Sequence, residues 1–232
     1  MFWEDDDTPQ EFQVPDDVID LAFNIQCREL PVDHIYVLNN TLCEAAPVLA
    51  EDPRIAIHEI HLAGSQNGWE RPDPKLGQKL ILSRRTKLHI RAPRDLRKRI
   101  EQALDGLTIE IDGCPMTIGR ARVKSLSRQG TLFARHIVLE PGEEDDENTF
   151  LMRLARQLQA RSIQVKKALC GTTRYIDTPD GSITTRSLLL ADLKPEDSVA
   201  LQQEGLGSHR HFGCGIFLPH KGIDPVKTAK DE

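Results

Sequence analysis

The sequence is poor in aromatic residues and holds no long hydrophobic run. Phe, Trp and Tyr make up 5% of its 232 residues, whereas an RNA-recognition sheet of the usual kind stacks bases on two or three aromatic side chains. No apolar stretch approaches the roughly 18 to 20 residues that a transmembrane helix needs. Residues 1–7 are largely acidic, where a signal peptide would be basic and then apolar. We therefore expect a cytoplasmic protein without a membrane segment.

Cysteine is scarce, and its pattern suggests neither disulfides nor a zinc ribbon. The five cysteines are odd in number, far apart and without a Cys-x-x-Cys pair, so free thiols are expected. His209 and His211 form a His-x-His pair, but no carboxylate or cysteine cluster completes a metal site around them. We therefore predict no metal and no cofactor.

The net charge of −6 is unevenly distributed, and most of the chain is basic. Residues 1–20 hold eight acids and residues 140–147 hold six, and neither stretch contains Lys or Arg. Removing these 14 from the 36 acids leaves 22 against 30 Lys and Arg, so the other 204 residues carry +8. A phosphate backbone is the natural partner of such an excess of cations on a folded chain.

The basic residues gather in three blocks, at 84–99, 113–139 and 148–176, and the last two contain no acid. The alternative is that they are solvated helix faces whose counter-ions lie elsewhere in the sequence. From these blocks we predict RNA contacts by Arg84, Arg85, Lys87, Arg91, Arg120, Arg122, Arg153 and Arg156.

The first half of the chain has the element order β-α-β-β-α-β. Apolar alternation predicts a strand at 18–25, and helical spacing predicts a helix that Asp33 caps and Pro47 ends. Two strands, at 55–62 and 80–90, flank a polar loop at 64–77. A helix beginning at Pro93 and a strand at 108–118, broken by the Asp112-Gly113 turn, close the unit.

The second half repeats this order. A strand at 131–139 precedes the acidic loop, and Asn148 or Thr149 caps a helix. Two strands, at 167–176 and 182–190, are followed by a helix from Pro195 to Gly205 and a strand at 213–218. We therefore predict an α+β fold of tandem ferredoxin-like, RRM-like units. The divisions are an acidic tail at 1–17, units at 18–128 and 129–220, and a tail at 221–232.

A glycine-rich stretch lies between the last predicted helix and the last strand. Its form is Gly-apolar-Gly, five residues, Gly-apolar-Gly. Such glycines permit close approach of a ligand and expose amide N–H groups, which suits phosphate. The stretch is neither a Rossmann fingerprint nor a Walker loop. It predicts RNA contacts by Gly205, Gly207, His209, Arg210, His211, Gly213 and Gly215.

These glycine pairs, following tandem ferredoxin-like units, resemble the RAMP superfamily of CRISPR-associated proteins. The resemblance is to the repeat-processing endoribonucleases of the Cas6 family. The sequences of residues 202–219 and 30–36, together with Ile57-His58 and residues 82–85, are similar to the type I-MYXAN branch. These patches span residues 18 to 219, which is nearly the whole chain.

The resemblance implies a metal-independent enzyme that cuts the repeat hairpin of precursor CRISPR RNA. In that chemistry the ribose 2′-hydroxyl attacks the phosphorus and leaves a 2′,3′-cyclic phosphate, and the product often stays bound in an interference complex with other effector subunits. Two alternatives are a non-catalytic RNA-binding subunit of such a complex and a nucleotide or metabolite enzyme that uses the glycine loop for phosphate.

Three residues are predicted to be catalytic. The family usually carries a catalytic histidine near its first helix, which indicates His34. The positive end of the helix dipole there favours a neutral ring that can accept a proton; the alternative is that His34 is only a residue of the capping turn. Tyr36 and Arg210 could position the 2′-hydroxyl or stabilise the phosphorane. His58 is a reserve candidate, and as strand residues it and His61 should point to opposite sides.

Overall fold

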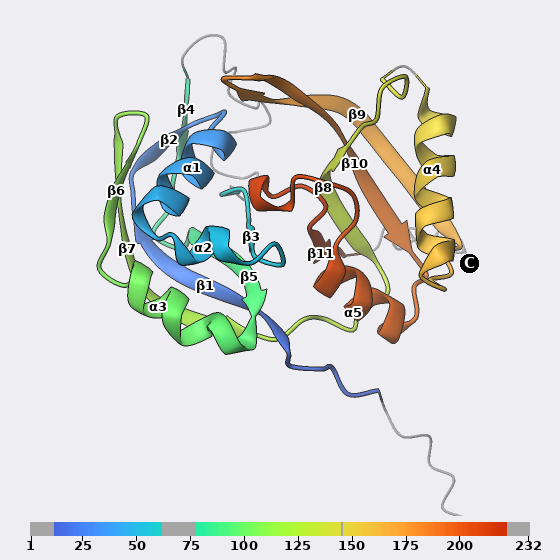
Figure 1. Cartoon of the computed structure of the whole chain (residues 1–232), viewed down its shortest axis with the longest axis horizontal. Helices are drawn as coiled ribbons and strands as arrows, with labels where there is room; N and C mark the ends of the chain where they lie inside the picture. Colours follow the sequence, from blue (N-terminus) through green and yellow to red (C-terminus); the bar gives the residue numbers. More distant parts are fainter. Residues whose placement is uncertain (1–11, 62–77, 145, 222–232) are drawn as a thin grey trace, which may run out of the picture.

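The computed structural model describes residues 12–61, 78–144 and 146–221, and it shows two antiparallel sheets side by side (Figure 1). The first sheet has the strand order β3-β5-β1-β7-β6. Without the hairpin strand β6, this is the order of a βαββαβ unit, with the first strand between the third and the fourth. Its elements are β1 (Val18–Gln26), α1 (Ile35–Ala45), α2 (Val48–Glu51), β3 (Ala56–Ile57), β5 (Lys87–Pro93), α3 (Arg97–Leu104), β6 (Thr108–Ile111) and β7 (Cys114–Lys124). A separate two-stranded sheet pairs β2 (Glu29–Pro31) with β4 (Lys79–Ile81).

The second sheet has the order β11-β8-β10-β9, which is the same arrangement. The predicted tandem ferredoxin-like architecture is therefore present. The residues between β7 and β8 separate the two sheets, and we propose units at 18–128 and 129–220. The elements are β8 (Leu132–Val138), α4 (Glu147–Ala160), β9 (Lys167–Thr178), β10 (Gly181–Ala191), α5 (Pro195–Glu204), the 3₁₀ turn η3 (Arg210–Phe212) and β11 (Phe217–Pro219).

Each sheet buries one face beneath its helices. In β1, Leu21 and Phe23 are fully buried in the core with residues of α1 and α3, whereas Asn24 and Gln26 are exposed. This alternation is the two-residue period of a half-buried strand. In the described part of the chain no helix is long and apolar enough to cross a membrane.

Several predicted element bounds are wrong. The strand expected at 80–90 is two strands, because Ser83 and Thr86 form a turn in which the Thr86 N–H donates to the Ser83 carbonyl (3.0 Å). The strands expected at 55–62 and 213–218 shrink to β3 and β11. His34, not Asp33, is the residue before the first helical position of α1. The polar loop at 64–77 lies outside the described residues.

The acidic segment at 140–147 helps to hold the second unit together. Asp146, rather than Asn148 or Thr149, caps α4, and its carboxylate accepts from the N–H groups of those two residues. Glu143 is buried and receives two bonds from Arg153, at 2.6 and 2.8 Å. Arg153 therefore does not present its guanidinium to RNA as predicted, because Glu143 and the Val138 carbonyl engage it.

Arg91 joins the two units from a fully buried position. Its Nε and Nη2 donate to the Asp20 carboxylate at 2.8 and 2.9 Å, and its Nη1 donates to the carbonyls of Gln202 and Phe217 in the second unit. The prediction that Arg91 contacts RNA is therefore wrong, since no part of it is exposed. The residue is instead a clamp between the units.

Candidate functional site

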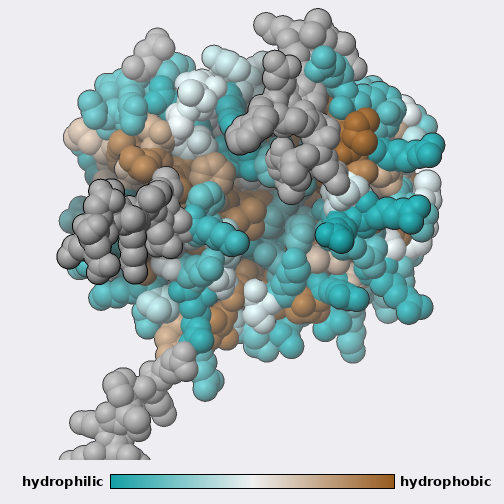
Figure 2. All heavy atoms as spheres, turned by 180° about the vertical axis from the view of Figure 1, so that it is seen from behind, coloured by the Kyte–Doolittle hydropathy of each residue, from teal (hydrophilic) through white to brown (hydrophobic). Residues whose placement is uncertain are grey.

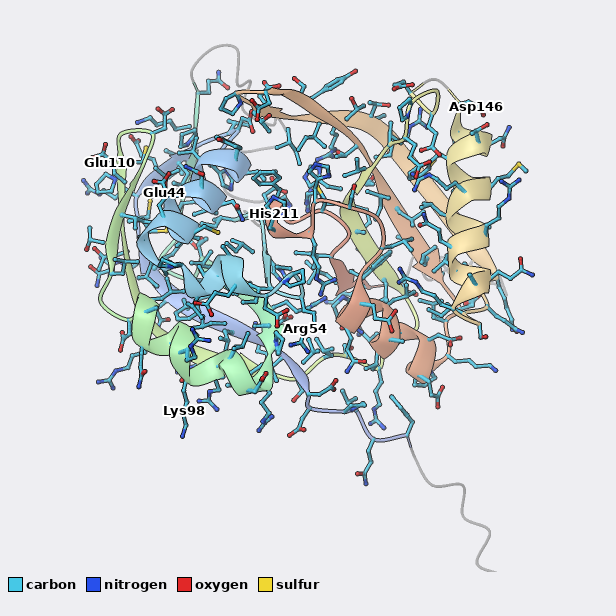
Figure 3. All side chains as sticks on the ribbon, in the orientation of Figure 1. Glu44, Arg54, Lys98, Glu110, Asp146 and His211 are labelled. Atoms are coloured by element: carbon cyan, nitrogen blue, oxygen red, sulfur yellow. The ribbon has the colours of Figure 1, made fainter. Side chains whose placement is uncertain are left out.

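The glycine-rich loop lies against the start of α1, at the junction of the two units. Asn39 of α1 donates a hydrogen bond from its side-chain amide to the backbone carbonyl of His211. Ile35 packs with Ile176 of β9 and Cys214 of the loop in a small hydrophobic cluster. Figure 3 shows His211 at this junction, between α1 and the strands of the second sheet.

Three of the four predicted phosphate-binding glycines are explained by the protein's own packing. A Cβ on Gly215 would lie 2.2 Å from the Leu206 carbonyl oxygen, and one on Gly213 would lie 2.9 Å from the Ile57 carbonyl oxygen. A Cβ on Gly205 would lie 2.6 Å from the Gly215 carbonyl oxygen. All three also have positive φ, which favours glycine. Gly207 also has a positive φ, but it is exposed, and a Cβ there would meet only the Ile137 side chain at an ordinary 3.9 Å.

The exposed side of the loop carries an aromatic and imidazole cluster with Tyr36. The His211 and Phe212 ring centres are 4.1 Å apart, and His211 lies 6.1 Å from the stacked ring of His209. The Phe212 ring is 5.7 Å from that of Tyr36, in the first turn of α1. Partial burial and the neighbouring His209 lower the pKa of His211 below its ordinary value. The cluster therefore places an exposed, neutral imidazole near the half-buried phenol of Tyr36.

His34 is fully buried, and the backbone engages both of its ring nitrogens. Its Nδ1 lies 2.9 Å from the Pro31 carbonyl oxygen, and its Nε2 accepts a bond from the Ile60 N–H at 3.2 Å. These partners assign the proton to Nδ1. Burial lowers its pKa, so the neutral ring expected from the sequence arises from desolvation. A role in proton transfer does not fit this conformation, because no ring atom reaches the surface.

The reserve candidate His58 and the loop residue Arg210 also point inward. The His58 side chain is buried, with Nε2 3.7 Å from Asp20 Oδ1. Arg210 donates to the backbone carbonyls of Arg54 and Gln203, and its buried Nη1 has no hydrogen-bond partner among the described residues. Burial and the nearby Arg91 lower the pKa of Arg210 to about 10. His58 is therefore not placed to act on RNA, whereas the half-buried Arg210 has its Nε and Nη2 engaged by the protein's own backbone.

A buried network between the units was not predicted from the sequence. His136 of β8 bonds Thr185 of β10 at 3.0 Å and Glu59 at 3.3 Å, and Arg135 also pairs with Glu59 at 3.3 Å. Burial alone would raise the pKa of Glu59, but His136 and Arg135 outweigh it and lower that pKa to about 2. Glu59 and Thr185 lie far in sequence from the adjacent Arg135 and His136 and share no motif with them, so no sequence signal could have found the network.

The outer face of the first sheet brings several predicted RNA-binding residues together. Arg120 and Arg122 are exposed on β7 and alternate with Ala121, which packs against the core. Lys87 of β5 pairs with Asn24 of β1 on the same face, and Arg84 and Lys87 line a hollow of about 1170 Å³ at one end of it. The right half of Figure 2, which carries this unit, is largely hydrophilic. Arg85 and Arg156 are exposed elsewhere.

Replacing His34 with Ala tests whether this residue has a structural role. Because the Pro31 carbonyl and the Ile60 N–H would lose their partner in a buried space, we expect unfolding to become easier by about 2–4 kcal/mol. Urea unfolding followed by circular dichroism measures the change. A variant that is as stable as wild type and yet inactive would instead return His34 to the catalytic role.

Comparison with known proteins gives one consistent answer. Residues 19–222 match the family model described as Cas6 Crispr. The chain is 28% identical over 201 residues to the CRISPR-associated endonuclease Cas6 of Myxococcus xanthus (strain DK1622), covering 87% of this chain and 81% of that protein. A solved CRISPR associated protein Cas6 has a TM-score of 0.60 at 9% identity, covering 88% of this chain and 100% of that one. A RAMP protein binding different RNA substrates has a TM-score of 0.58 at 13% identity, covering 86% and 98%. These two structures confirm the RAMP-type fold.

Proposed function

Because this chain belongs to the Cas6 family of CRISPR proteins, we propose that it is an endoribonuclease that binds the repeat hairpin of precursor CRISPR RNA and cuts it. The observation that carries the proposal is the cluster that the exposed His209 and His211 of the glycine loop form with the half-buried Tyr36 of α1. It lies on a chain whose first unit also presents an exposed basic sheet face. Cutting without a metal needs a base, an acid and groups that stabilise charge on the phosphorane.

The cluster supplies these groups in a simple arrangement. The neutral His211 takes the proton from the ribose 2′-hydroxyl, and the 2′-oxygen then forms a bond to phosphorus. The bond from phosphorus to the 5′-oxygen breaks, and His209 is proposed as the acid that gives a proton to that leaving oxygen. The Tyr36 hydroxyl donates to a non-bridging oxygen of the phosphorane. The products are a 2′,3′-cyclic phosphate and a 5′-hydroxyl, and no metal takes part.

The basic face is proposed to bind the RNA backbone. Neither Arg120 nor Arg122 has an acidic partner among the described residues, so each can neutralise a phosphate. We place Arg84, Arg85, Lys87 and the exposed backbone at Gly207 in the same role, with Arg156 as a more distant contact. We expect the cut RNA to stay bound to this chain, in a complex with other effector subunits.

Removing a cation from this face should weaken binding in a salt-dependent way. We expect Arg122→Ala to lower affinity for the repeat RNA at low salt and to reduce the slope of log K against log salt by about 1. Fluorescence anisotropy at several salt concentrations measures both. Lys98→Ala is the matched control, because Lys98 is exposed on α3 and points away from the molecule in Figure 3. An equal effect of both variants would contradict a binding face on the sheet.

A second candidate function is a non-catalytic RNA-binding subunit of a CRISPR effector complex. The burial of His34 and His58 favours it, because His34 is fully buried and His58 is only 7% exposed. Incubating the purified protein with its repeat RNA separates the two functions. Specific cutting supports the endoribonuclease, whereas tight, salt-sensitive binding without cutting supports the subunit.

A further inference from the structure

The outer face of the second sheet carries a row of four apolar side chains, one on each strand. Leu169 of β9 pairs with Leu189 of β10, Leu189 with Phe133 of β8, and Phe133 with Leu218 of β11. The neighbouring Ala134 lies in the core of this unit, so the alternation of each strand turns the row away from that core. Leu169 is 62% exposed and Leu218 is 41% exposed.

The row continues the surface that the glycine loop covers. Further along the same sheet face, Ile176 and Ile183 pack against Ile35 and Cys214, so the loop and α1 cover that end. A cavity of about 70 Å³ lies at the boundary. Its lining combines Phe133, Leu218, Gly213 and Ile216 with the polar side chains of His58, Glu59, His61, Arg135 and His136. Phe133 and Leu189, in the middle of the row, are half-buried. The row and the loop are therefore adjacent parts of one surface.

Cationic and imidazole groups lie beside the row, around Phe133. The guanidinium carbon of Arg135 lies 5.7 Å from the Phe133 ring centre. The ring of His220 is also 5.7 Å away, tilted by 50°. His61 contacts Arg135, and Lys221 follows His220 at the exposed end of β11. The acid that lines the cavity, Glu59, is mostly buried and engaged by Arg135 and His136.

This composition fits unpaired nucleotides better than a protein surface. Sites for single-stranded RNA combine an aromatic face, on which a base stacks, with cations that follow the phosphates. Brown side chains in the left half of Figure 2, which carries the second unit, show that apolar groups are exposed on the side seen from behind. We propose that the Phe133 row binds unpaired nucleotides next to the repeat hairpin, with a base on Phe133 and its phosphate near Arg135 and His220. This inference rests on the proposed RNA-processing function.

The test uses hexauridylate as a probe for unpaired RNA and the full chain as the protein. We expect Phe133→Leu to weaken binding about tenfold, because it keeps an apolar side chain but removes the stacking ring. Phe133→Tyr should bind as wild type does. Tyr175→Ala is the matched control, because Tyr175 is 65% exposed on β9 and pairs with Thr184 on the opposite face of the sheet from Ile176. Fluorescence anisotropy gives the affinities, and circular dichroism verifies folding.

The outcomes separate this inference from the proposed function. Selective loss of hexauridylate binding in Phe133→Leu, with recovery in Phe133→Tyr, supports the site whether or not the wild type cuts repeat RNA. Unchanged hexauridylate binding in a folded Phe133→Leu variant overturns it, even if repeat RNA is cut normally. Self-association of the wild type that Leu169→Ser abolishes, with hexauridylate binding unaffected by either variant, would make the row a protein interface and also overturn it.

Discussion

The His211→Ala variant is expected to lose cleavage of the repeat RNA by about 10²- to 10⁴-fold, which is the contribution of a positioned acid or base. Its ring is exposed, and the bond from Asn39 reaches only its backbone carbonyl. The substitution should therefore leave the fold and most of the RNA affinity intact. Single-turnover cleavage at saturating protein measures the chemical step separately from binding.

The pH dependence of the cleavage rate tests the role of His211 in a second way. Because the pKa of His211 is lowered, the base form predominates at neutral pH, and the wild-type rate should fall only when the pH drops below the ordinary value of 6.5. His211→Ala should lack this acid limb. Asn40→Ala, an exposed change on α1, serves as the control and should cut normally. Normal cutting by His211→Ala, with loss in a stable His34→Ala, would move the proton transfer to His34.

The Arg91→Met variant is expected to lose about 3–5 kcal/mol of stability, because it leaves the largely buried Asp20 carboxylate without its cation. The carbonyls of Gln202 and Phe217 lose a donor as well, so the contact between the units weakens. For a chain of this length the midpoint of thermal unfolding should fall by about 10 °C. Arg122→Met, on the exposed face of β7, should change stability by less than about 0.5 kcal/mol.

The ion pair between Arg91 and Asp20 also predicts how the stability lost in Arg91→Met depends on pH. Burial would raise the pKa of Asp20, but Arg91 and His58 outweigh it and hold that pKa well below its ordinary range. A lowered pKa contributes stability that is present above the unfolded value of 3.8 and is lost as the pH falls below it. The gap between wild type and Arg91→Met should therefore narrow in acid. A gap that stays constant from pH 7 to pH 3 would contradict the ion pair as its source.

Sequence patterns predicted the fold well where neighbouring residues determine the structure of an element. The alternation at 18–25 became β1, and Asp112-Gly113 became the turn between β6 and β7. Gly205 ends α5 with a positive φ of 69°. The errors fall where distant segments decide. The last strand begins only at Phe217, because the loop before it packs on β3 through Gly213.

The candidate site was harder to predict, because burial decides which charged residues can act. Arg91 and Arg122 are both arginines of basic blocks, but Arg91 finds partners 71, 111 and 126 positions away in the sequence. Similarly, the family resemblance indicated His34, while the fold exposes His211 from the loop beside it. The row at Phe133 could not be found either, since it depends on the register of four strands.

The central claim is that this chain cuts repeat RNA with its own side chains. The most direct measurement incubates the purified protein with the repeat RNA in EDTA and maps the ends of the products. We predict one cut in the repeat, a 2′,3′-cyclic phosphate on the upstream fragment and a 5′-hydroxyl on the other. Cutting that requires an added divalent ion, or products with a 5′-phosphate, would contradict the account.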